Sequence, residues 1–105
     1  MLDYIAAAER LMDGMTFEDF EEDEKTILAL TRAVEIVGEA AKNVPIPLRE
    51  QYPDIQWKQL VGMRDRLAHG YFTIDLTVVW NAAQYVLPTF KPTIQTMLDQ
   101  QTTDN

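Results

Sequence analysis

Apolar residues recur at helical spacing along most of this 105-residue chain. The clearest stripe has spacings of three and four residues and consists of Ile27, Leu30, Val34, Val37 and Ala41. Such spacing places the apolar side chains on one face of an α-helix. No stretch alternates apolar and polar residues between turn residues, as a half-buried β-strand would. The pattern therefore predicts an all-α fold.

Residues with known preferences for helix ends divide the first half of the chain. Gly14 is expected to follow the end of a first helix, and Thr16 with Asp19 resembles a short capping box. Pro45 and Pro47 are expected to end the second, long helix, because proline cannot continue a helix.

The second half contains two further helices. Residues 47–54 predict a connector with one helical turn, and a third helix should run from Trp57 to near Gly70. Asp75 is expected to cap a fourth helix. The apolar stripe of this helix stays in phase across Pro88, which predicts a kink at the proline rather than the end of the helix. Four helices with short connections predict a four-helix bundle, with a single domain over residues 1–100 and a frayed polar tail over residues 101–105.

The composition restricts the compartment. The chain has no cysteine, which excludes disulfides and thiolate metal sites, and it has only short apolar runs. Asp3 and Glu9 stand where a signal peptide would carry a basic start and an apolar segment. We therefore expect a cytoplasmic protein that does not enter a membrane.

A net charge of -8 would ordinarily argue against a polyanionic substrate. The charge is local, however, because residues 1–24 hold nine acids and one base, whereas residues 25–105 hold eight of each. The acidic run from Glu18 to Glu24 is expected to form a solvated face or a helix start, and a docking surface for a basic partner is the alternative.

The segment around His69, the only histidine in the chain, concentrates functional groups. Metal-independent RNA cleavage needs a group that transfers protons and a fixed cation that stabilises charge on the phosphate. His69 can supply the first, and the arginines Arg64 and Arg66 can supply the second. A structural helix cap for His69 and surface ion pairs of the arginines with Asp65 are the alternative interpretations.

The spacing within this segment poses a geometric difficulty. Arg64 and His69 are five residues apart, so on a regular helix they lie about 140° apart around the axis, whereas Arg66 and His69 would share a face. Two arrangements would bring Arg64 and His69 together: His69 beyond the last helical turn, or a second subunit that supplies a second copy. The sequence leaves both open.

The order Arg64, four residues, His69, one residue, Tyr71 resembles the R-x4-H-x-Y signature of HepT toxins in the HEPN family. The resemblance extends over residues 2–98. Three further segments carry it: residues 35–42 resemble the family's E-I-x-G-E-A-x-K helix, residues 52–57 its Y-P-x-I-x-W connector, and residues 62–65 its G-M-R-D segment. The chain departs from the family pattern in a short first helix and in Gly70, where a larger residue is common.

The resemblance implies a HEPN-type bundle that acts as a homodimer, with active sites along the subunit interface. It implies an RNA-cleaving toxin in which Arg64 binds the phosphate and His69 transfers protons. Asp65 and Arg66 are supporting candidates, and the Asp65 carboxylate could orient either arginine or a partner's His69. Tyr71 would be the residue to which an MntA-like nucleotidyltransferase antitoxin attaches AMP, adding bulk and negative charge beside Arg64.

Two further expectations concern neighbouring groups. Glu35 and Glu39 lie one helical turn apart and are expected to serve packing or interface hydrogen bonds rather than catalysis. No metal or other cofactor is expected, because no carboxylate cluster at metal-ligand spacing lies near His69. The alternative function is a non-catalytic helical dimer that binds a nucleotidyltransferase partner or a nucleotide.

Overall fold

The computed structural model describes residues 2–69 and 75–103, and for Met63, residues 65–69 and residues 101–103 it describes the backbone alone. Helices account for the regular structure of these residues, and no strand occurs among them, so the all-α prediction is confirmed. The elements are α1 (Leu2–Met12), α2 (Phe17–Glu21), α3 (Glu24–Lys42), α4 (Ile46–Glu50), α5 (Trp57–His69), α6 (Leu76–Asn81), the π-helical segment η1 (Ala82–Val86) and α7 (Leu87–Thr103).

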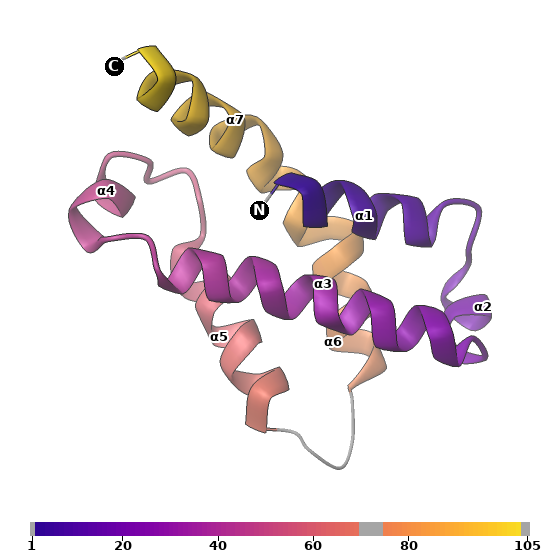
Figure 1. The fold of residues 1–105 in the computed structure, drawn as a ribbon. Helices are drawn as coiled ribbons and strands as arrows, with labels where there is room; N and C mark the ends of the chain where they lie inside the picture. The colour runs from indigo at the N-terminus through magenta and orange to yellow at the C-terminus, as the bar shows by residue number, and fades with distance from the viewer. Residues whose placement is uncertain (1, 70–74, 104–105) are drawn as a thin grey trace.

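The long helix α3 lies at the centre of the bundle and contacts α1, α5 and α6 (Figure 1). The continuous helix formed by α6, η1 and α7 closes the bundle against α1. An ion pair between Lys91 on α7 and Glu9 on α1, 3.2 Å from nitrogen to oxygen, also joins these helices. The largest fully buried side chains include Ile5, Phe20, Leu30, Leu60, Leu87 and Phe90. The predicted four-helix bundle is therefore confirmed.

Three helices begin with a side-chain N-cap, and the sequence predicts two of these caps, Thr16 and Asp75. Thr16 and Asp19 form a reciprocal capping box at α2, with both hydrogen bonds 3.1 Å long. Asp75 accepts a hydrogen bond from the Val78 backbone at α6. Asp23 caps α3, and hydrogen bonds from Thr26 lower the pKa of its carboxyl group. Part of the acidic run thus serves as helix starts.

The connector contains the expected helical turn, but its start differs from the prediction. α3 already ends at Lys42, and Pro45 is the N-cap of α4, with Pro47 in the first turn. Proline is favoured there because the first turn leaves its N–H groups unpaired in any case. The two prolines therefore begin a new helix rather than end the previous one.

The expected kink of the last helix takes the form of a π-helical segment just before Pro88. Within it the Leu87 backbone N–H donates to the Ala82 carbonyl, five residues back. A wider turn suits this place, because Pro88 has no N–H and its ring would clash with the carbonyl four residues earlier. Figure 1 shows the helix axis changing direction between α6 and α7. α7 also contains Pro92 and continues to Thr103, three residues into the predicted tail, whose fraying stays a prediction.

Candidate active site

Arg64 lies on α5 and packs against α3 at the closest approach of these two helices. At Gly38, an added Cβ atom would lie 2.4 Å from the Arg64 Cβ atom and 3.1 Å from the Leu60 carbonyl oxygen. Real Cβ atoms do not approach so closely, so only glycine fits this position. The contact leaves the Arg64 side chain 28% exposed. The guanidinium is therefore carried on a stem that the helix packing restrains.

The carboxylate of Glu39 pairs with this guanidinium. Its Oε1 atom lies 3.7 Å from an Arg64 terminal nitrogen, and the Glu39 side chain is 42% exposed. An ion pair so open to water contributes little to stability, but it favours one direction of the guanidinium. Glu35, one turn earlier on α3, instead accepts a 3.2 Å hydrogen bond from Arg32. Glu39 thus has a partner within the predicted site, whereas we expected a packing or interface role.

The other predicted site residues fall outside the described side chains. Asp65, Arg66 and His69 lie on α5 but are described by their backbone only, and Tyr71 lies outside the described residues. Their roles stay predictions. α5 includes His69 as its last residue. The first of the two alternatives, that His69 lies beyond the last helical turn, is therefore wrong. On one regular helix, positions 64 and 69 remain about 140° apart around the axis.

Gly38 is the residue of the candidate site whose packing role sequence reasoning missed. A lone glycine within a helical pattern usually has a packing or functional reason, and that signal was present in residues 24–42. The sequence alone could not say which helix approaches it. Among the described residues, no group of three or more His, Cys, Asp or Glu could hold a metal ion. None of the described helices is long and apolar enough to cross a membrane.

Gly38→Ala is expected to destabilise the protein by about 1–3 kcal/mol, because the new methyl group must push α5 away from α3. The direction of this change in stability is informative, because replacing glycine with alanine inside a helix ordinarily stabilises a protein by up to about 1 kcal/mol. Urea unfolding at one fixed protein concentration measures the change.

Gly62→Ala is the matched control, because a Cβ atom at Gly62, on α5, would meet nothing within 4 Å. This variant should be as stable as the parent or up to about 1 kcal/mol more stable. Equal stabilisation by both substitutions would contradict the close packing of α3 on α5 at Gly38.

Comparison with known proteins places the chain in a family. The family described as ribonuclease HepT-like matches residues 1–97. A protein of Thermococcus cleftensis named probable ribonuclease HepT is 42% identical over 94 residues, which cover 86% of this chain and 86% of that protein. A candidate RNase of Methanocaldococcus jannaschii is 38% identical over 91 residues, covering 87% of this chain and 75% of its own length. A candidate RNase of Caldanaerobacter subterraneus is 35% identical over 88 residues, covering 84% and 79%. No solved structure matches the chain. The chain therefore belongs to the ribonuclease HepT-like family.

Proposed function

We propose that this protein is the toxin of a toxin–antitoxin system and cleaves RNA internally without a metal ion. Family membership supports the substrate class. The structural observation that carries the proposal is the restrained guanidinium of Arg64, which lies five residues before the only histidine. A preorganised cation stabilises charge that develops on a phosphate without having to reorganise during the reaction.

Each residue then has a distinct part in the reaction. The Arg64 guanidinium binds oxygens of the scissile phosphate, for which its planar fork is suited. His69 takes the proton of the ribose 2′-hydroxyl or donates one to the leaving 5′-oxygen. Glu39 keeps Arg64 directed toward the substrate. Asp65 and Arg66 support this arrangement.

The active form would be a homodimer with the motif helix at its interface. Because positions 64 and 69 diverge on α5, a second copy of the helix is the remaining way to bring an arginine and a histidine together. Leu28 on α3 is 58% exposed. A second subunit would cover this apolar side chain.

The proposed control of the toxin is covalent. An MntA-like nucleotidyltransferase antitoxin would transfer AMP from ATP to the hydroxyl group of Tyr71, seven residues after Arg64, and release pyrophosphate. The attached phosphate would compete with the substrate phosphate for the guanidinium, and the nucleoside would obstruct access. Both proteins would act in the cytoplasm.

The direct test is a digestion of RNA in EDTA. We expect cleavage to persist at an unchanged rate, because the proposed reaction uses only side chains of the protein. The products should carry 2′,3′-cyclic phosphate ends, since the neighbouring 2′-hydroxyl is the proposed nucleophile. Gel electrophoresis of a labelled RNA, followed by mass analysis of the ends, measures both features.

The same digestion with His69→Ala controls for contaminating nucleases. Activity that disappears on chelation would overturn the metal-independent mechanism. Equal cleavage by the parent protein and the His69→Ala variant would favour the alternative, a helical dimer that binds its nucleotidyltransferase or a nucleotide without cutting RNA.

A further inference from the structure

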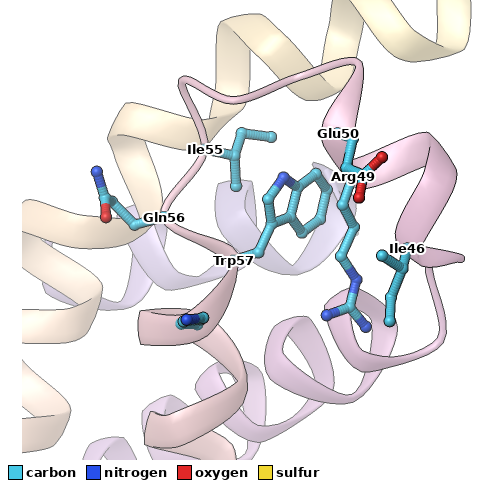
Figure 2. A pocket seen from close by; sticks show the side chains of 7 residues that line it. Ile46, Arg49, Glu50, Ile55, Gln56 and Trp57 are labelled. Carbon is cyan, nitrogen blue, oxygen red and sulfur yellow. The ribbon is translucent and has the colours of Figure 1, made fainter.

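A pocket of about 390 Å³ opens where α4, the connector and the start of α5 meet. The residues that line it are Ile46, Arg49, Glu50, Ile55, Gln56, Trp57 and Lys58. Figure 2 shows the Trp57 ring between Ile55 and the Arg49 side chain, with Ile46 beyond Arg49. Its size lies within the range of small-ligand sites. Apolar groups, the cations Arg49 and Lys58, and the carboxylate of Glu50 thus meet in one opening.

Two anchors, the buried Trp57 and the half-buried Arg49, make the walls of this pocket firm. Trp57 is only 8% exposed, and its ring nitrogen donates a 3.1 Å hydrogen bond to the Tyr52 carbonyl. The central guanidinium carbon of Arg49 lies 6.0 Å from the centre of the Trp57 ring, a cation–π contact. Arg49 also donates 2.8 Å hydrogen bonds to the carbonyls of Val44 and Lys42. These bonds use two of its five N–H groups, so the cation is fixed while donors remain for a ligand.

The pocket lies in the part of the chain that is richest in positive charge. Residues 42–66 carry five bases and three acids, whereas all other residues carry four bases and 14 acids. An acidic protein with one basic segment attracts a polyanion to that segment. Lys58 is exposed at the pocket and contributes to this local charge.

The pocket and Arg64 are joined by α5, whose first residues line the pocket and which also carries Arg64. Trp57 and Arg64 are seven residues apart, which places them on the same side of α5 and about 10 Å apart along its axis. Arg49, on α4, donates a hydrogen bond to the carbonyl of Lys42, the last residue of α3. Lys42 lies three residues after Glu39, the partner of Arg64. A strand that contacts both places would have to span about 10 Å along α5.

We propose that this pocket is a second contact site for the RNA strand. Lys58 and Arg49 bind a backbone phosphate there, and the apolar wall formed by Ile46 and Ile55 receives a base. Ile46, which lines the pocket next to Arg49, is 65% exposed and so open to such a contact. The inference takes its ligand, RNA, from the proposed function. It adds a second place, at a distance from the scissile bond, where the protein holds the strand.

The test measures binding of a fluorescent single-stranded RNA by anisotropy, with His69→Ala in every protein so that the RNA stays intact. Adding Lys58→Gln should weaken binding about fivefold at 0.1 M salt, because one phosphate contact contributes about 0.7 to the slope of log affinity against log salt. The magnitude of this slope should decrease by about 0.7. Lys25→Gln is the matched control: it removes one exposed lysine from the far end of α3 and should change neither quantity.

Ile46→Ser tests the base contact separately. It should weaken binding while leaving the salt slope unchanged, since no phosphate contact is lost. Equal affinities for the Lys58→Gln and Lys25→Gln proteins would overturn the inference. So would a Lys58→Gln protein that binds RNA normally but loses its nucleotidyltransferase partner, because the pocket would then be a protein-docking site.

Failure of the inference is distinguishable from failure of the proposed function. If the parent protein cuts RNA in a His69-dependent way while Lys58→Gln binds normally, only the pocket assignment is wrong. If binding depends on Lys58 but no RNA is cut, the pocket stands and the nuclease proposal is wrong.

Discussion

His69→Ala is expected to lower the rate of RNA cleavage by about 10²- to 10⁴-fold, the usual contribution of a positioned proton-transfer group. The chain has no second histidine to replace it. Proton transfer would fall to water, which is neither oriented nor restrained by α5. Initial rates on one labelled RNA in EDTA measure the loss.

Two controls separate chemistry from folding in this experiment. The unfolding curve and the RNA affinity of His69→Ala should match those of the parent protein. Adding Arg64→Gln to His69→Ala should slow the reaction by much less than Arg64→Gln alone does, because residues that act as one unit are not additive. A His69→Ala rate within tenfold of the parent rate would exclude His69 as the proton-transfer group.

Transfer of AMP to Tyr71 is expected to remove cleavage activity altogether, because the modification adds a phosphate where the substrate phosphate must bind. Tyr71→Phe should keep much of the nuclease activity, since the hydroxyl group has no part in the proposed reaction. The variant should nevertheless escape silencing and stay toxic when both proteins are expressed together. Colony counts under joint expression, with intact-mass measurements of the purified protein, record the two effects.

His69→Ala expressed with or without the antitoxin should be harmless, which ties toxicity to cleavage. Two outcomes would contradict the assignment. One is an AMP-sized mass increase on Tyr4, Tyr52 or Tyr85 in place of Tyr71. The other is a Tyr71→Phe protein that the nucleotidyltransferase still silences by transferring AMP.

Local sequence was sufficient to predict those features of the fold that depend on near neighbours. The caps at Thr16 and Asp75 each use a backbone group three residues away, so their physical cause lies within one helical turn. The turn after α1 is equally local, because Gly14 adopts a φ of 75°, which side chains disfavour. The role of Pro45 and Pro47 is harder to predict, because proline can end one helix and is also favoured in the first turn of the next.

The candidate site depended on contacts between helices, which periodicity does not determine. The motif predicts Arg64, but no local pattern predicts that Gly38 touches it or that Glu39 is its carboxylate partner. The π-helical turn of η1 was likewise hidden, because the apolar stripe keeps its phase through it. Arg49 was not singled out, since its importance comes from the Trp57 ring and two carbonyls that folding brings to it.

The pairing of the first helix with the last has a consequence for the synthesis of this chain on the ribosome. α1 packs against α7, and Glu9 pairs with Lys91 across 82 residues of sequence. A nascent chain that has not yet released α7 leaves the buried face of α1, with Ile5 and Ala8, covered only in part, by α3 and η1. The domain therefore completes its fold only after α7 has left the ribosome, and a product truncated before α7 is expected to be removed by proteolysis rather than accumulate.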